Sequence, residues 1–291
     1  MNDPIHLPFK DGKGGVDIGL RPIEESSWLE IDHLFSEEIA LKEKLYLEKK
    51  DQVLVTSPNS QDIQKEVLNL VLGHLKNHHN DSYELKTDTI ESKRNNHLYY
   101  FDDFQDPLEL ASLLVQEDLI IMKPKENIFY LDSASLCAPT RWSLREKFQQ
   151  SLSELHQSVP GYKDKIDSRV NTIFTNLPDQ KIFERYNWSI FDSPELFQPI
   201  SNKSLVEIKN TKPEELFIRV ERQTIRRLHC SRAILFAVRV HVNPITDIIN
   251  NKKAVFDLIQ AIQNLEEDMK TYKVIKPFEE NLINWLKSKN E

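Results

Sequence analysis

The runs FIRVERQTIRR at residues 217–227 and RAILFAVRVHV at residues 232–242 carry the strongest strand signals in the sequence. Both runs are rich in β-branched and apolar residues, which is typical of strands. The run ERYNWSIF at residues 184–191 carries the same signal. Residues 119–124 and 127–137 form a further pair of strand-like runs, joined by a tight turn at 124–126. These runs together predict an antiparallel sheet.

Helical patterns flank the strand-like runs. Apolar residues recur at helical spacing, which predicts helices at residues 23–50, 60–77, 108–116, 142–157, 166–177, 254–272 and 278–287. The polar segment 77–104 is expected to be rich in loops. Because no sharp break in composition divides the chain, we expect one α+β domain over residues 1–291, with helical extensions at about 1–80 and 251–291.

The composition narrows the classes of function. The chain has 291 residues, a net charge of −8, six glycines and two cysteines. So few glycines argue against a phosphate-binding loop, and two cysteines can neither ligate a four-thiolate iron–sulfur cluster nor form a disulfide framework. The acidic balance argues against broad nucleic-acid binding, and no apolar run is long enough to span a membrane. Low cysteine usage and the lack of a secretory h-region lead us to expect a cytoplasmic protein.

The strand at 217–227 carries charge on both faces. Alternation places Arg219, Glu221 and Gln223 on one face. Val220, Arg222 and Thr224 occupy the other. Two interpretations stay open: a solvated sheet face with cross-strand ion pairs, or a polar pocket wall in which arginines bind a carboxylate and Glu221 binds a cation.

Two further groups of residues are candidates for a site. His156 lies at the edge of an apolar stripe that includes Leu152 and Leu155. It is either a core histidine with one hydrogen bond or an axial ligand that faces an apolar pocket. Gln116 and Glu117 end a predicted helix, where acidic groups oppose the helix dipole. They are either neutralised by the arginines or part of a site.

Several segments together resemble one family. They are HLPF, GLRPI, DPLELASLLVQEDL, LCAPTRWSLREK, HQSVPGY, NW and RVERQTIRRL, which begin at residues 6, 19, 106, 136, 156, 187 and 219. Across residues 5–245 the chain resembles the haem-dependent oxidative N-demethylases, which are related to the catalytic subunit of dimethylamine monooxygenase.

The resemblance implies a fold and a haem site. The fold is a single PAS-like domain that binds haem b, with an antiparallel sheet and a helix at 142–157 that presents His156 to the iron. His229 is the rival ligand, but its surroundings, RLHCSR, depart from the proline and arginine usual there. The resemblance makes the cationic side chains on the 217–227 strand candidates to hold the haem propionates: Arg219, Arg222 and Arg226.

The resemblance also implies a reaction. O2 and two electrons remove an N-methyl group from a small secondary amine such as dimethylamine, giving formaldehyde. Glu221, with Gln223 beside it, is the candidate to bind the amine, and Gln116 and Glu117 are weaker candidates in the same pocket. NAD(P)H, flavin and an iron–sulfur cluster would act only through a separate reductase. The alternatives are a haem-binding sensor or carrier without turnover, and a haem-free interaction protein.

Overall fold

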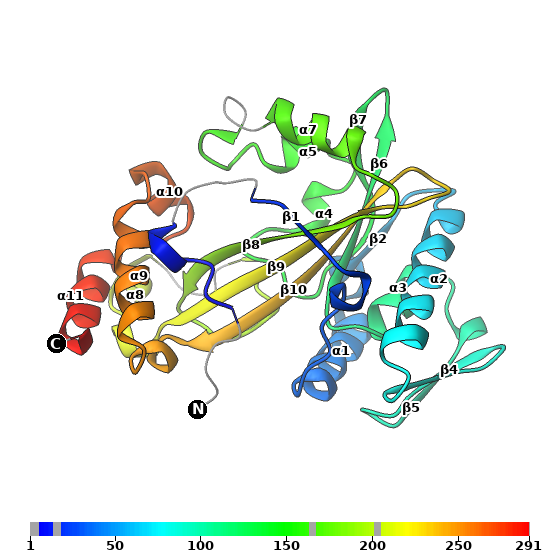
Figure 1. Cartoon of the computed structure of the whole chain (residues 1–291), viewed down its shortest axis with the longest axis horizontal. Helices are drawn as coiled ribbons and strands as arrows, with labels where there is room; N and C mark the ends of the chain where they lie inside the picture. The colour runs from blue at the N-terminus through cyan, green and yellow to red at the C-terminus, as the bar shows by residue number, and fades with distance from the viewer. Residues whose placement is uncertain (1–5, 14–18, 163–166, 201–204, 291) are drawn as a thin grey trace.

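The computed structural model of the chain, which describes residues 6–13, 19–162, 167–200 and 205–290, is built around a seven-stranded antiparallel sheet (Figure 1). In spatial order the strands are β1 (Arg21–Ile23), β8 (Ile182–Phe191), β9 (Phe217–Arg227), β10 (Ile234–Pro244), β6 (Asp118–Lys125), β7 (Ile128–Ser135) and β2 (Leu54–Thr56). All adjacent strands pair antiparallel, as the strand-like runs predicted. The α+β class is confirmed.

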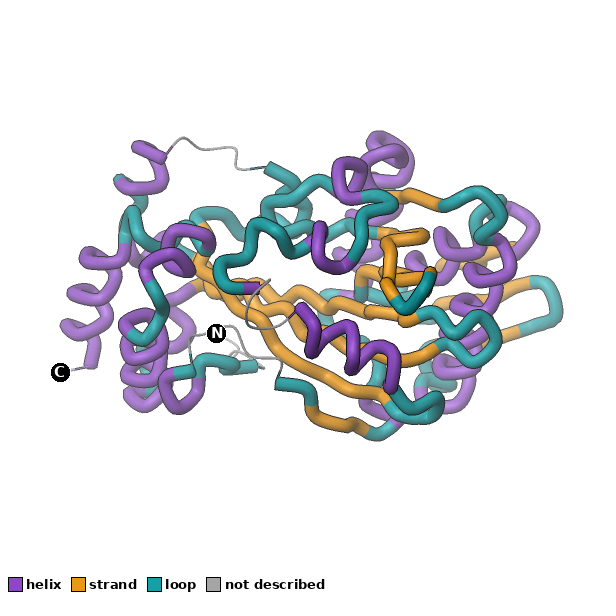
Figure 2. Tube along the Cα trace, turned by 90° about the horizontal axis from the view of Figure 1, so that it is seen from above, coloured by secondary structure: helices purple, strands orange, loops and turns teal. Residues whose placement is uncertain are grey.

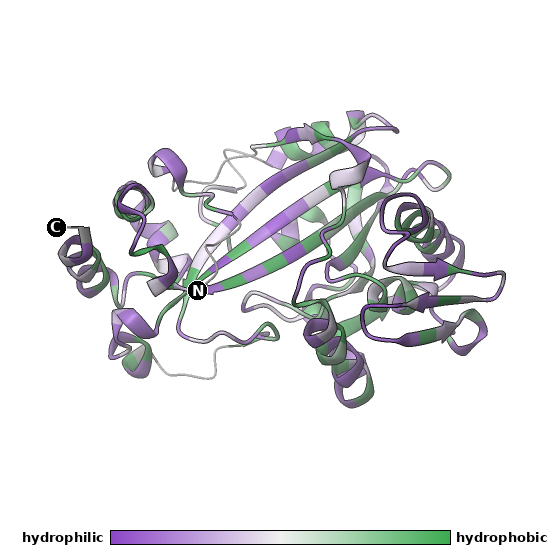
Figure 3. Cartoon of the chain, turned by 60° about the horizontal axis from the view of Figure 1, so that its bottom comes forward, coloured by the Kyte–Doolittle hydropathy of each residue, from purple (hydrophilic) through white to green (hydrophobic). Residues whose placement is uncertain are grey.

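The three central strands are long and paired along most of their length. Glu221 on β9 lies opposite Asn187 on β8 and opposite Val240 on β10. In Figure 3, hydrophilic and hydrophobic residues alternate along these strands, so each face of the sheet receives its own set of side chains. The turn between β6 and β7 falls at Glu126 and Asn127, which both have positive φ, rather than at 124–126.

Helices and a small second sheet cover one face of the main sheet. The helices are α1 (Phe35–Val53), α2 (Gln61–His78) and α3 (Pro107–Leu113), and the second sheet contains β3 (Tyr83–Leu85), β4 (Thr89–Ser92) and β5 (His97–Tyr100). Their apolar faces form one core with the odd-numbered residues of β6 and β10, such as Leu119 and Leu235. The segment 77–104, predicted to be rich in loops, contains the three short strands of this second sheet, which were not predicted, and turns at 79–82, 86–88 and 93–96.

The first predicted helix also begins later than expected. The stretch from residue 23 contains a 3-10 turn, η2 (Glu25–Ser27), and then an irregular segment, so that α1 starts only at Phe35. Trp28 in this stretch is fully buried, and the segment that follows it carries Glu30 and Asp32 under the sheet. Tertiary contacts of these side chains outweigh the helical spacing of the apolar residues.

Short helices lie over the opposite face. They are α4 (Leu144–Lys147), α5 (Leu152–Leu155) and α7 (Asp167–Asn176). The single helix predicted at 142–157 is broken, because Gln149 and Gln150 exchange backbone hydrogen bonds with Leu131 of β7. The hydroxyl and backbone of Ser151 then form a capping box with Glu154 at the start of α5.

The C-terminal helices pack at one end of the sheet. In Figure 2 the long strands run between this group and the helices at the other end. The group comprises α8 (Leu205–Lys209), α9 (Lys252–Gln263), α10 (Glu267–Tyr272) and α11 (Glu279–Asn290). One helix was predicted over 254–272, but the helix is interrupted near Asn264, between α9 and α10. The remaining 3-10 turns are η1 (Lys10–Gly12), η3 (Phe101–Asp103), η4 (Pro213–Glu215) and η5 (Ile245–Ile248).

The N-terminal turn is anchored on the C-terminal helices. Phe9 is fully buried and meets Trp188 edge-to-face at 5.8 Å. Asn264 donates a hydrogen bond to the carbonyl of Gly12, which has a φ of +71° and would bring a Cβ within 3.0 Å of Gln260. Across the described ranges, no helix has both the length and the hydrophobicity needed to span a bilayer.

Candidate functional site

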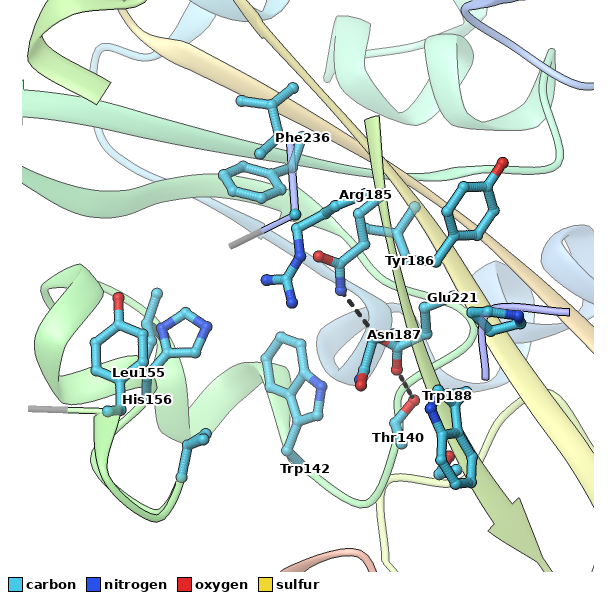
Figure 4. Close-up of a pocket in the computed structure, with 18 of the residues that line it drawn as sticks. Thr140, Trp142, Leu155, His156, Arg185, Tyr186, Asn187, Trp188, Glu221 and Phe236 are labelled. Carbon is cyan, nitrogen blue, oxygen red and sulfur yellow. Dashed lines mark hydrogen bonds between the residues drawn. The ribbon is translucent and has the colours of Figure 1, made fainter. Parts of the chain in front are cut away.

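A cavity of about 880 Å³ lies against one face of the main sheet (Figure 4). This volume is within the roughly 300–1,000 Å³ typical of ligand and cofactor pockets. Its floor is formed by β6, β8, β9 and β10, and its cover by the segment from Ala138 to Tyr162, by α7 and by residues 269–274. Much of its wall is apolar and includes Met122, Leu131, Leu152, Leu155, Phe174 and Phe236.

Glu221 supplies a carboxylate to one side of this cavity. The hydroxyl of Thr140 donates to its Oε1 at 2.5 Å, and the amides of Gln223 and Asn187 donate to its Oε2 at 2.9 and 3.3 Å. Burial alone would raise the pKa of Glu221, but these donors and the charge of Arg219 hold it below its usual value. Glu221 is therefore an anion that lines the cavity, and Gln223 lines the cavity beside it.

Arg219 lies behind Glu221 rather than in the cavity. Its guanidinium is 1% exposed and donates to Thr140 Oγ1 at 3.3 Å. Further hydrogen bonds reach the carbonyls of Ala138, Pro139, Glu195 and Leu196. Burial lowers its pKa to about 10, although Glu221 and Asp118 act to raise it. Because its donors are engaged by protein oxygens, Arg219 positions Thr140 and Glu221 and is not placed to bind a propionate.

His156 lines the cavity at the end of α5. Its Nδ1–H donates to the carbonyl of Leu152 at 2.9 Å, and its ring stacks on Tyr162 at 4.5 Å with an angle of 11°. Burial lowers the pKa of His156, and the charges of Arg185 and Lys147 lower it further. No hydrogen bond joins Nε2 to any residue that the structure describes. In a neutral imidazole whose Nδ1–H is bonded in this way, the Nε2 lone pair has the orientation and protonation state that a metal requires of a ligand.

Cationic side chains also line the cavity. In the view of Figure 4, Arg185 and Trp142 lie between His156 and Glu221. Lys147 lines the cavity on the α4 side. Lys273 donates to Asn187 Oδ1 at 3.0 Å and to the carbonyl of Trp188, and burial lowers its pKa to about 8.

The other two predicted propionate ligands point to the opposite face. Arg222 donates to Glu184 at 2.9 Å and to the carbonyls of Ser27 and Trp28. Arg226 donates to Glu25 at 2.8 Å, with its guanidinium 4.4 Å from the centre of the Trp28 ring. Both arginines tie the segment around η2 to the sheet, so neither lines the cavity.

Gln116 and Glu117 are likewise separated from the cavity. Gln116 donates to Asp32 and Glu38 at 2.9 Å, and it accepts from the backbone N–H of Asp32 at 3.0 Å. Glu117 accepts from the backbone N–H of Glu30 at 2.7 Å, and burial raises its pKa to about 7. The expectation that both residues share the pocket of Glu221 is wrong, because they belong to a buried polar layer under the other face.

His229 does not reach the cavity either. It lies in the turn between β9 and β10, its side chain is 85% exposed, and its nearest charged neighbour is Asp179 at 3.8 Å. Between the two histidines considered, only His156 lines the cavity.

Sequence reasoning missed several lining residues. Arg185 and Asn187 lie opposite Gln223 and Glu221 on the neighbouring strand, so alternation within residues 184–191 and antiparallel pairing contained the signal. Thr140 and Trp142 lie in an irregular segment, and Lys273 follows α10. Outside helices and strands the sequence shows no regular alternation of apolar and polar residues, so the direction of these side chains could not be inferred from it.

The donor set fits a haem. An apolar wall suits the macrocycle, a neutral imidazole suits the iron, and the lining cations Arg185 and Lys147 suit the propionates. In the comparison with known families, the model described as "Haem-dependent oxidative N-demethylase, alpha subunit-like" matches residues 19–283.

Proposed function

The chain belongs to the haem-dependent oxidative N-demethylase, alpha subunit-like family, and we propose that it removes a methyl group from a small secondary amine. The observation that supports this most is the pairing, in one cavity, of a half-buried neutral histidine with an anionic glutamate (Figure 4). A PAS-like single-domain architecture and a cytoplasmic location are parts of the same proposal.

His156 is the proposed axial ligand of haem b. The Leu152 carbonyl fixes the tautomer of the imidazole, and the stacked ring of Tyr162 fixes its plane. Arg185 and Lys147 replace the arginines of β9 as the proposed propionate donors, because both line the cavity and lower the pKa of His156. When bound, the haem supplies the O2-dependent oxidation of the methyl group.

The remaining lining residues orient the amine. The carboxylate of Glu221 binds the substrate nitrogen as an ammonium, and the ring of Trp142 offers a face to the same positive charge. Thr140, Asn187 and Gln223 hold the carboxylate in place through hydrogen bonds. The apolar walls exclude water from the methyl group. The expected products are the demethylated amine and formaldehyde.

Electrons for this reaction are proposed to come from a separate protein. Cys137 is buried and Cys230 is exposed, and two cysteines cannot ligate a four-thiolate cluster. The proposed electron donor is a reductase that uses NAD(P)H, a flavin and an iron–sulfur cluster. The words "alpha subunit-like" in the family description support a system of several protein components.

A peroxide-driven experiment tests the proposal without the reductase. Haem-loaded protein is mixed with dimethylamine and with hydrogen peroxide, which takes the place of O2 and two electrons, and is then assayed for formaldehyde. The proposal expects up to one formaldehyde and one methylamine per peroxide consumed, and much less formaldehyde from dimethyl ether, which has the same two methyl groups but carries no positive charge at neutral pH. Haem binding with no formaldehyde from any small methylated amine would instead support a sensor or carrier, and absence of haem binding would support an interaction protein.

A further inference from the structure

Three potential metal ligands meet on the sheet face opposite Glu221. His6 Nε2 lies 3.1 Å from Glu30 Oε1, and His241 Nε2 lies 2.9 Å from Glu30 Oε2. The nearest ligand atoms of the three side chains all lie within 4.8 Å of one another. This His6–Glu30–His241 cluster includes the histidine of the HLPF motif, and the proposed reaction makes no use of it.

Each side chain of the cluster is positioned independently. His241 lies on β10 opposite Val220, in the longest strand pair of the sheet. The backbone N–H of Glu30 donates to buried Glu117 at 2.7 Å. His6 lies three residues before fully buried Phe9, and its ring contacts Tyr186 at 4.9 Å. The cluster therefore joins the N-terminal segment, the segment after η2 and the sheet.

The two imidazole-to-carboxylate separations suit tetrahedral coordination. Zinc binds imidazole nitrogen and carboxylate oxygen at about 2.0–2.2 Å, so neighbouring ligand atoms lie about 3.4 Å apart. The two imidazole-to-carboxylate distances, 3.1 and 2.9 Å, are within about half an ångström of that value. Two imidazoles and one carboxylate are also a ligand set that borderline divalent metals prefer.

Charge and access are compatible with a cation. Arg222 Nε lies 3.4 Å from Glu30 Oε1, but it is closer to Glu184, at 2.9 Å, and that carboxylate offsets its charge. The side chains of His6 and Glu30 are 18% and 26% exposed, so an ion and a water ligand can reach them. His241, at 8%, forms the buried side of the cluster.

We propose that His6, Glu30 and His241 bind one divalent transition-metal ion of the zinc type, with water completing the coordination. The ion clamps the N-terminal segment onto the sheet. The lining of the cavity continues past β8, beyond the residues that pair with β1, to His6, Leu7 and Pro8, so the clamp fixes part of the cavity's rim. This site is separate from His156 and does not depend on the proposed reaction.

Metal titration of the tag-free full chain tests the proposal. After chelator treatment and buffer exchange, zinc binding is measured by calorimetry, and bound zinc and iron are counted separately by elemental analysis. We expect one zinc per chain, and at least a tenfold loss of affinity in each of His6→Ala, Glu30→Gln and His241→Ala. The matched control His229→Ala, an exposed histidine, should bind as the wild type does.

A second readout separates ligation from misfolding. Co²⁺ in a four- or five-coordinate site absorbs visible light more strongly than six-coordinate Co²⁺ in water does, so binding to the cluster should give new absorption bands. His6→Ala, which alters only the edge of the fold, should abolish these bands. Its far-UV circular dichroism spectrum should stay the same as that of the wild type. Wild-type protein that binds neither metal would overturn the proposal, as would variants that bind as tightly as the wild type. In that case the cluster is a hydrogen-bonded array.

Discussion

Glu221 is the residue on which the proposed amine recognition depends. Three side-chain donors and the nearby charge of Arg219 keep it anionic although it is surrounded by protein. An anion on a cavity wall attracts a cation of matching size. In the proposed complex a substrate ammonium lies between Glu221 and the aromatic ring of Trp142, which adds a direct ion pair to the nearby charges of Arg219 and Lys273 and allows a small, weakly functionalised molecule to be selected.

Replacing this charge should weaken substrate binding. Glu221→Gln keeps the shape and loses the charge-assisted contact, which contributes about 2 kcal/mol, so we expect a rise in KM of about 30-fold. The visible spectrum of the bound haem should not change, because Glu221 is not a proposed ligand. Steady-state formaldehyde assays would measure the effect, with the exposed Glu214→Gln as control. An unchanged KM would exclude the amine-binding role.

Glu117 should make stability depend on pH. Burial raises its pKa to about 7 from an ordinary 4.5, so the folded state binds more protons than the unfolded state between these values. Stability conferred by the protonated form is present below pH 4.5 and is lost as the pH rises through 7. The charged side chains that interact with the Glu117 carboxylate are Arg222, Arg239 and Glu30.

Glu117→Gln removes this titration. Relative to the variant, the wild type should lose about 2 kcal/mol of unfolding free energy between pH 5 and 7.5. Urea denaturation at four pH values would show it. Parallel pH profiles for the two proteins would show that Glu117 is ionised throughout the range.

At the scale of elements, the short helix α5 sets the position of His156. Its capping box joins Ser151 and Glu154, shortly before the histidine. The backbone carbonyl of Leu152, which lies between them, accepts a hydrogen bond from the imidazole of His156. Helix α5 has only four residues, so its cap and its contact with β7 through Ser151 and Tyr130 contribute much of its order.

Removing the cap should loosen the proposed haem ligand. Ser151→Ala should lower the unfolding free energy by about 1 kcal/mol and speed transfer of haem to an acceptor protein. Thermal unfolding and stopped-flow transfer would measure both effects. Ser168→Ala, an exposed position on α7, is the control. Equal transfer rates in wild type and Ser151→Ala would contradict the link between the cap and His156.

The elements also show what the sequence can and cannot predict. Period-two alternation identified the long strands, and Glu221 and Gln223 do share a face that lines the cavity. The same alternation placed Arg222 on the opposite face. Its predicted role as a propionate ligand came only from the family resemblance. The helix at 142–157 was overpredicted because pairing of Gln150 with β7 depends on a partner distant in sequence. Such long-range competition is invisible to local periodicity.

At the scale of the whole molecule, the main sheet separates two polar regions. One face carries the cavity, and the other carries a buried layer of ion pairs in which Arg222 meets Glu184 and Arg239 meets Glu38 and Asp32. This layer fastens the segment around η2 to the centre of the sheet. Its arginines therefore stabilise the fold, whereas Arg185 and Lys147 line the cavity on the other face.

A substitution of Arg222 should distinguish these roles. Arg222→Met leaves Glu184 with less compensation, and we expect a loss of about 3 kcal/mol of unfolding free energy. Its folded fraction should keep the wild-type haem spectrum. Arg145→Met, at an exposed pair with Asp51, should change stability by less than about 0.5 kcal/mol. A loss of haem affinity in Arg222→Met with unchanged stability would show instead that Arg222 acts in haem binding and not in folding.

The proposed reaction requires that the cavity hold a haem through His156. The most direct test is the visible absorption spectrum of His156→Gly after haem-supplemented expression, recorded without and with added imidazole. We expect a stoichiometric Soret band in the wild type, its loss or marked shift in the variant, and its restoration by imidazole, which fills the vacated ligand position. A wild type without haem, or a His156→Gly protein whose haem spectrum matches the wild type without imidazole, would contradict it.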